Sequence, residues 1–238
     1  AWTEINVPQR PFEIENVDTV TVPLAQSGYT TEYLRYRITI NDRPNETNYY
    51  RIVIDKQTTL WGYNHEEGGD DYIYWTKHSY NFIGREDVVL TDGQPTTGDD
   101  EDNGLFDTAK NIYGVFDDTR FRNTSYTMTV YNNTKIETGS DSGYFSGMDV
   151  IIRLMSITET EYYYLKALNL VDSAAYDETI NEPIKYPSNV HGGTGMVGIS
   201  TEVTQTIHII SSSHSKGNLA PPVHVYQYAP AIRPHESE

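Results

Sequence analysis

The chain carries a short run of acidic and amide residues, DDEDNG, starting at Asp99, whose oxygen atoms could bind a calcium ion. In an EF-hand loop, calcium takes oxygen ligands from positions one, three, five and nine. Asp99, Glu101, Asn103 and Asp107 stand at these positions. However, Lys110 occupies the twelfth position, where the pattern needs a bidentate glutamate. The run therefore predicts either a calcium site on a β loop or, more ordinarily, a solvated acidic loop.

Aromatic residues stand on both sides of a second acidic turn, EEGGDD, which begins at Glu66. Aromatic faces stack on sugars or anchor peptides, and neighbouring polar groups orient such a ligand. The aromatic residues in question are Trp61, Tyr63, Tyr72, Tyr74 and Trp75. They predict a binding surface for a glycan or a peptide, and the competing interpretation is ordinary packing between strands.

Patterns that would indicate catalysis are weak in this chain. A glycosidase needs two carboxylates that face each other, and 34 acidic residues leave no basis for choosing a pair. The sequence lacks the G-x-S-x-G turn of α/β-hydrolases. Its seven histidines include no H-x-x-x-H pair for zinc. We therefore expect a non-enzymatic protein without a cofactor other than the calcium considered above, and retain a glycan or peptide hydrolase as the alternative.

The composition restricts the partners of the protein. With 34 acidic and 17 basic residues, the formal charge is −17, and such a surface repels nucleic acid and anionic lipid headgroups. Cysteine is absent, which excludes disulfides and a cysteine nucleophile in this chain. No apolar run approaches the roughly 20 residues of a membrane helix. Because no signal-peptide pattern is present either, we expect Ala1 to follow a segment that is not part of this sequence.

Alternating apolar and polar residues, together with twenty tyrosines, predict an all-β protein. Two of the predicted strands, 33–40 and 48–55, flank the turn NDRPN, and we expect them to form a hairpin. A loop is predicted at 91–104 and another at 137–147. The remaining strands are predicted at 17–24, 58–63, 72–76, 80–83, 111–116, 125–131, 149–157, 196–200, 202–210 and 223–228.

One short helix is predicted near residues 159–170, because Thr158 and Glu161 form the S/T-x-x-E pattern of a capping box. Glycines at 192, 193, 195 and 198 predict positive φ angles or close approaches where the chain returns to the fold. The apolar positions that recur at helical spacing, and that we expect to pack on a sheet, are Tyr164, Leu165, Leu168 and Val171.

These elements predict an antiparallel sandwich or barrel-like sheet of about ten to twelve strands with one helix. The pattern does not distinguish a closed barrel from an open sandwich. We expect residues 1–16 to form an extended lead-in, residues 17–230 a single β domain, and residues 231–238 a loose tail.

Six short segments, in their order and spacing, are similar to those of a known family. They are INVPQRPFEI, NYYRI at 48–52, VFDDTRFRNTSYTMTV at 115–130, VIIRLMSITETEYYYLKAL, EP at 182–183 and SNVHGGTGMVG at 188–198. Together they span most of the chain and resemble a family of Bacteroidota outer-membrane lipoproteins, catalogued as domain of unknown function 4249. The chain departs from the family at Met196 and Val197, where an aromatic residue is usual.

The resemblance implies a C-terminal β domain of a lipid-anchored protein on the outer surface of the outer membrane. The lipid-bearing cysteine and an immunoglobulin-like sandwich would then lie upstream of Ala1, and the anchor would be the protein's only attachment to the membrane. The resemblance also implies an accessory role in a TonB-dependent nutrient-uptake system, a SusCD-like complex. The implied partners are the transporter and its associated lipoproteins. The family has no established catalytic residues, so the resemblance implies none here.

Overall fold

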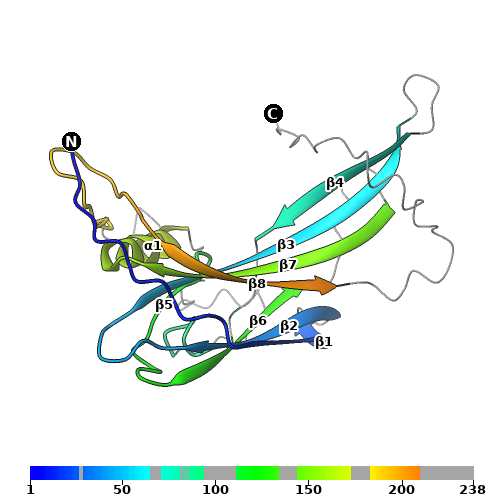
Figure 1. Ribbon diagram of the computed structural model, residues 1–238, viewed down its shortest axis with the longest axis horizontal. Coiled ribbons are helices and arrows are strands. Elements are labelled where there is room, and N and C mark those ends of the chain that lie inside the picture. The colour runs from blue at the N-terminus through cyan, green and yellow to red at the C-terminus, as the bar shows by residue number, and fades with distance from the viewer. Residues whose placement is uncertain are drawn as a thin grey trace. The chain divides into compact units, whose positions relative to one another are not determined.

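The computed structural model describes residues 1–26, 29–64, 71–80, 82, 84, 86–93, 111–133, 144–172 and 183–209. These residues form eight strands in two antiparallel sheets and one short helix, which confirms the predicted all-β class (Figure 1). No helix in this part of the chain has the length and apolar composition needed to cross a membrane. The tail predicted at 231–238 lies outside the described residues.

The elements follow one another along the chain with the helix between the last two strands. They are β1 (Asn16–Gln26), β2 (Tyr29–Asn41), β3 (Tyr49–Asn64), β4 (Asp71–Ser79), β5 (Val115–Asp117), β6 (Ser125–Asn133), β7 (Tyr144–Ile157), α1 (Glu159–Val171) and β8 (Thr201–Ile209).

The chain is organised in two compact units. Unit 1 comprises residues 1–53, 81–134 and 152–205, and unit 2 comprises residues 54–80, 135–151 and 206–238. Strands β3, β7 and β8 contribute residues to both units. The single β domain expected over residues 17–230 stays a prediction.

The strand order contradicts the predicted hairpin between residues 33–40 and 48–55. One sheet has the order β1-β2-β6, and the other has the order β4-β3-β7-β8 with β5 pairing with β3. The two stretches therefore lie in different sheets, and β2 forms its hairpin with β1. Alternation identified the strands but not their partners, because any antiparallel neighbour satisfies the same pattern. The turn after β2 is held by the loop before β6, where Asp42 N–H donates to the Thr124 carbonyl.

Several predicted boundaries also differ. The strands predicted at 48–55 and 58–63 are one continuous strand, β3. Tyr80, Phe82 and residues 196–200 are not in strands, and the loop predicted at 137–147 overlaps the start of β7 at Tyr144. Of the strand predicted at 111–116, only its end lies in β5. The strand predicted at 223–228 lies outside the described residues.

The core of unit 1 lies on the apolar faces that the alternation predicts. An aromatic column connects its two sheets: the ring of Tyr50 on β3 stacks with Phe121, and Phe121 stacks with Tyr126 on β6. The buried apolar side chains of β2, β3, β6 and β7 in this unit are Tyr33, Leu34, Tyr36, Ile38, Ile40, Tyr50, Ile52, Met128, Val130, Tyr131, Ile152, Leu154 and Ile157.

The helix begins as predicted. Thr158 is its N-cap, and the Thr158 hydroxyl accepts the backbone N–H of Glu161 at 3.2 Å. The side chain of Glu161 accepts the backbone N–H of Ile199 and packs against Gly198, where an added Cβ would lie 2.8 Å from the carboxylate. The cap thereby connects the helix to the segment that leads into β8.

The buried face of the helix is shifted from the predicted one. Tyr162, Leu165 and Asn169 are buried, whereas Tyr164 and Leu168 are only partly buried against the same cluster. The shift has a polar cause, because Asn169 accepts the backbone N–H of Tyr113 and donates to the side chain of Asn111. A periodicity of apolar residues alone does not reveal such a buried amide.

Gly114 provides a test of the packing in unit 1. Its φ is +65°, and a Cβ added there would lie 2.2 Å from the carbonyl oxygen of Ile52. We predict that Gly114→Ala lowers the free energy of unfolding by about 1–3 kcal/mol or more, because both the backbone angle and the contact become strained. Chemical denaturation of the full chain measures the change. Gly193→Ala is the control, because the added Cβ makes ordinary contacts with Val190 at 3.4 Å and Ala1 at 3.6 Å. Equal losses of stability in both variants would contradict the strain assigned to position 114.

Candidate functional site

The structure describes only part of the predicted aromatic surface. Tyr74 is buried in β4 and Trp75 is half-buried. The backbone register pairs Trp61 with Tyr74 and Tyr63 with Tyr72. The side chains of Trp61, Tyr63 and Tyr72, and the acidic turn between the strands, lie outside the described residues. The binding surface at these five residues stays a prediction.

The calcium ligands proposed from sequence, Asp99, Glu101, Asn103 and Asp107, also lie outside the described residues, so the calcium site stays a prediction. In the part of the chain that the structure does describe, no group of three or more His, Asp or Glu side chains could hold a metal ion.

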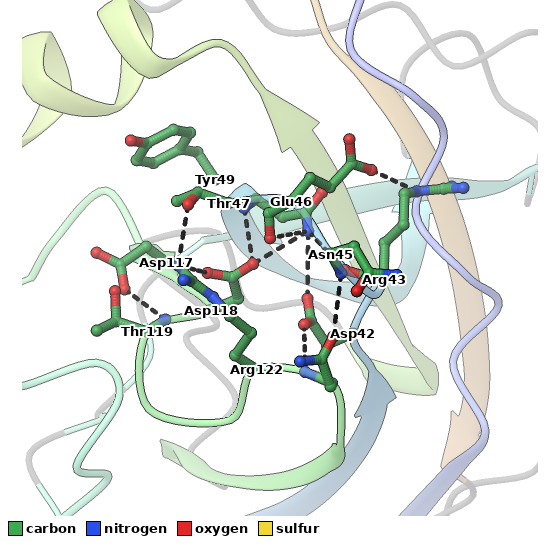
Figure 2. Close-up of polar contacts among 12 residues, drawn as sticks. Asp42, Arg43, Asn45, Glu46, Thr47, Tyr49, Asp117, Asp118, Thr119 and Arg122 are labelled. Carbon is green, nitrogen blue, oxygen red and sulfur yellow. Dashed lines mark hydrogen bonds and ion pairs between the residues drawn. The ribbon is translucent and has the colours of Figure 1, made fainter.

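Unit 1 contains a buried pair of carboxylates that the sequence analysis did not single out. Asp42 follows β2 and Asp118 follows β5, and both side chains are buried. Asn48 connects them: its backbone N–H donates to Asp118 Oδ2 at 2.8 Å, and its side-chain amide donates to the same oxygen at 3.0 Å and to Asp42 Oδ1 at 3.4 Å (Figure 2). We call these three residues the carboxylate cluster. It joins the end of β2, the start of β3 and the end of β5.

Further donors surround the carboxylate cluster. The backbone N–H of Asn123 donates to Asp42 Oδ2 at 2.8 Å, and Arg122 donates to Asp118 Oδ1 at 3.3 Å (Figure 2). Burial raises the pKa of Asp42 above its usual value, and the nearby charge of Asp118 raises it further, although the hydrogen bond from Asn123 acts in the opposite direction. The carboxylate oxygens of Asp42 and Asp118 therefore accept hydrogen bonds from neighbouring loop residues and hold these loops together.

A second buried carboxylate has a similar role. Asp87 accepts the backbone N–H groups of Val89 and Leu90 with Oδ1 and that of Thr129 with Oδ2, and the Tyr126 hydroxyl donates to Oδ1 at 3.1 Å. Burial raises the pKa of Asp87, while these hydrogen bonds lower it, and the net direction is upward. Asp87 therefore closes the turn that follows it and fastens that turn to β6.

A partly exposed network of charged and hydroxyl groups lies at the side of α1. Tyr162 donates its hydroxyl to Asp117 Oδ2 at 3.0 Å, and the Lys166 ammonium donates to the Tyr162 hydroxyl at 3.3 Å and to Asp92 Oδ2 at 2.6 Å. Burial raises the pKa of Asp117, but hydrogen bonds from Thr119 and Tyr162 and the charge of Lys166 outweigh it, so its pKa is lowered. A depression of about 480 Å³ beside this network is lined by Val89, Asp92, Asp117, Thr119 and Arg120.

A polar groove of about 400 Å³ opens at the N-terminus of α1. Its walls are the lead-in (residues 4–9), the segment that enters β3 (residues 46–49) and the junction of β7 with α1 (residues 156–160). Asn189 completes the lining. Carboxylates, amides and hydroxyls dominate, one aromatic ring (Tyr49) is present, and no lysine or arginine is among the lining residues. We call this the polar groove.

The lead-in is fastened along the segment that returns to β8 (Figure 1). Trp2 forms a β-bridge with His191, and their rings stack at 4.1 Å. Further along, the Thr201 hydroxyl donates to the Pro8 carbonyl, and Arg10 Nε donates to the Glu202 carbonyl. Exposed apolar side chains stand on both segments and are together called the apolar strip: Trp2, Val7, Phe12, Tyr186, Val197 and Ile199.

Unit 2 contains two histidine–aspartate pairs between neighbouring strands. His78 Nδ1 on β4 lies 3.0 Å from Oδ1 of the buried Asp55 on β3, and Gln57 donates to the other Asp55 oxygen at 2.7 Å. His208 Nδ1 on β8 lies 2.6 Å from Asp149 Oδ1 on β7. Each pair joins two strands that are adjacent in the sheet.

The carboxylate cluster was missed because Asp42 and Asp118 stand beside turns, where aspartate is ordinary, and Asn48 is the first residue of the strand predicted at 48–55. The signal that could have pointed to them is the run FDDTRFRN after residue 115, which has an unusual density of polar side chains between two apolar segments. The polar groove had no such signal, since its walls come from three distant segments.

The fold and these features define the class of protein: a mostly β protein of two antiparallel sheets, whose buried carboxylates fasten loops beside a polar groove. The chain belongs to the family described as Domain of unknown function (DUF4249), whose family model matches residues 1–206. The match confirms domain of unknown function 4249, to which the short segments are similar. Comparisons with the curated proteins and with the solved structures found no significant match.

The pKa of Asp42 is raised and that of Asp117 is lowered, so the two residues should affect the pH dependence of stability in opposite directions. The raised pKa of Asp42 means that the folded state favours its neutral form, so its contribution to stability falls as pH rises from the ordinary value of 3.8 through the raised pKa. Asp117 has the reverse sign: its contribution is present above 3.8 and is lost as pH falls through its lowered pKa.

We therefore expect Asp42→Asn to cost less free energy of unfolding at about pH 7 than at about pH 4, and Asp117→Asn to cost more at about pH 7 than at about pH 3. Denaturant titrations of both variants and of the unmodified chain across this range measure the differences. Each variant serves as the control for the other, and pH profiles of the same sign for the two would contradict the network described above.

Proposed function

We propose that this chain is a non-enzymatic domain of a Bacteroidota cell-surface lipoprotein. In this proposal it lies outside the outer membrane, attached through a lipid anchor that is not part of this chain. There it serves a TonB-dependent nutrient-uptake system, of the SusCD-like kind, by binding a ligand or the transporter. Membership in the family rests on the match over residues 1–206, and the lineage, the lipid anchor, the location and the uptake role are our proposal.

The observation that carries a binding role over a hydrolytic one is the placement of the perturbed carboxyl groups. A hydrolase with an acid catalyst needs a carboxyl of raised pKa facing its substrate cleft. The described carboxyls of raised pKa are Asp42, Asp87 and Glu161. None of them lines the polar groove or the depression beside α1. Instead, these three carboxylates accept hydrogen bonds from the backbone N–H groups of Asn123, Thr129 and Ile199, respectively.

The apolar strip supports contact with a protein partner. Trp2 has 61% of its surface exposed, Val7 59% and Val197 45%, and they stand on two segments that hydrogen bonds hold together. Exposed apolar side chains that recur along two adjoining segments of a protein with net charge −17 suit an interface with another protein. We assign this surface to the transporter complex.

The test is purification of the full-length protein from its native membrane in mild detergent, followed by mass spectrometry. We expect a TonB-dependent transporter and its lipoproteins in stoichiometric amounts. The double variant Val7→Asp/Val197→Asp should lose them, because it places charges on the apolar strip. Ile112→Asp, on a described exposed residue outside the strip, is the control and should retain them.

If the unmodified protein purifies without a TonB-dependent transporter, the transporter role is overturned. If the Val7→Asp/Val197→Asp variant still retains the transporter, the apolar strip is not part of the interface. Turnover of a glycan or peptide by the purified chain would contradict the non-enzymatic assignment and favour the hydrolase alternative.

A further inference from the structure

We propose that the polar groove at the N-terminus of α1 is a glycan-binding site that takes a neutral oligosaccharide. This inference rests on the proposed binding function and names the class of ligand for it. It concerns residues of unit 1 that the predicted aromatic surface does not include.

The size and construction of the groove suit a small ligand. Its volume of about 400 Å³ lies within the range of roughly 300–1,000 Å³ that is usual for small-molecule sites. One wall, the lead-in, is held in place by the bonds from Thr3 to Asn189 and from Thr201 to Pro8. The opposite wall is the start of β3, which the carboxylate cluster fixes through Asn48. The groove is therefore formed before any ligand arrives.

The charges of the lining disfavour an anionic ligand. The groove contains the carboxylates of Glu4, Glu46 and Glu159 and no lysine or arginine among its lining residues, and these carboxylates repel a phosphate or carboxylate against the attraction of the α1 N-terminus. Two of the three carboxylates already have partners: Glu46 pairs with Arg43 at 3.5 Å, and Glu159 accepts the Tyr49 hydroxyl at 3.0 Å. This engagement favours a neutral ligand over a cationic peptide, which would need free carboxylates.

The hydrogen-bonding groups match sugar hydroxyls. A hydroxyl group both donates and accepts, and so does a side-chain amide, which offers an oxygen acceptor and two N–H donors. Asn6 and Gln9 present such amides from the exposed lead-in wall, and Thr160 and Thr47 add hydroxyls, that of Thr47 also accepting a hydrogen bond from Arg122. The groove therefore offers groups of both kinds at its surface, as a polyhydroxylated ligand requires.

An aromatic surface lies at the same place. The ring of Tyr49 lines the groove and contacts the rings of Tyr162 at 4.9 Å and Tyr163 at 6.3 Å. Tyr163 leaves 49% of its surface exposed, whereas Tyr162 is buried. Aromatic faces give an apolar surface on which the C–H face of a sugar ring packs. Amides, hydroxyls and the ring of Tyr49, which Tyr162 and Tyr163 hold in place, together favour a carbohydrate over a ligand without an apolar face.

The experiment uses the full purified chain and a panel of neutral hexasaccharides from starch, cellulose, mannan, xylan and laminarin, tested by isothermal titration calorimetry. Oligogalacturonate represents anionic glycans, and a tetralysine peptide represents cationic ligands. We expect one or more neutral oligosaccharides to bind. Asn6→Ala/Gln9→Ala should weaken that binding about tenfold, since the loss of two hydrogen bonds of this kind is worth about that factor.

Asn16→Ala is the matched control, because Asn16 carries an exposed amide on β1 that does not line the groove. This variant should bind the oligosaccharide as tightly as the unmodified chain does. Circular dichroism establishes that the variants fold. The inference is overturned if no neutral oligosaccharide binds, if Asn6→Ala/Gln9→Ala binds as well as Asn16→Ala, or if tetralysine alone binds. The calorimetry contains no transporter. If no oligosaccharide binds, the glycan site fails, and co-purification with the transporter still tests the proposed function separately.

Discussion

The hydrogen bonds that Asn48 makes to two buried carboxylates fix the point where the chain leaves one sheet and enters the other. The carboxylate of Asp118 accepts both the backbone N–H and the side-chain amide of Asn48, so the start of β3 has one position relative to the loop before β6. Asp42 and Asn123 fasten the end of β2 to the same loop. Removal of any one partner would leave buried donors or charges unsatisfied, which costs far more than an exposed contact of the same length.

The polar groove depends on that constraint. One of its walls is the segment that Asn48 holds, and another is the N-terminus of α1, whose position is set by Thr158 and by the contact of Glu161 with the segment before β8. The same segment holds the lead-in through the bridge between Trp2 and His191. In the proposed site the buried carboxylates act indirectly, because they hold the walls of the groove and leave its exposed amides and hydroxyls unbound by the carboxylate cluster.

Local patterns predicted much of this fold, and long-range polar contacts account for what they missed. Alternation located β2 and β6, and the pair Thr158 and Glu161 located the start of the helix, because both signals depend on neighbours in the sequence. The predicted hairpin was wrong because the partner of β3 depends on bonds between residues about seventy positions apart, as in Asn48 and Asp118. The groove was missed for the same reason: no local pattern relates Asn6, Tyr49 and Thr160. The aromatic and calcium residues chosen from sequence stay predictions.

The most direct test of the central claim, that this domain docks onto a transporter through the apolar strip, is site-specific photo-crosslinking in intact cells. A photoreactive phenylalanine analogue replaces Val7 in the full-length protein, and in a second strain it replaces Ile112. The account predicts that position 7 crosslinks to a TonB-dependent transporter and that position 112 does not. Equal crosslinking at the two positions, or none at position 7 while the protein is present at the cell surface, would contradict it.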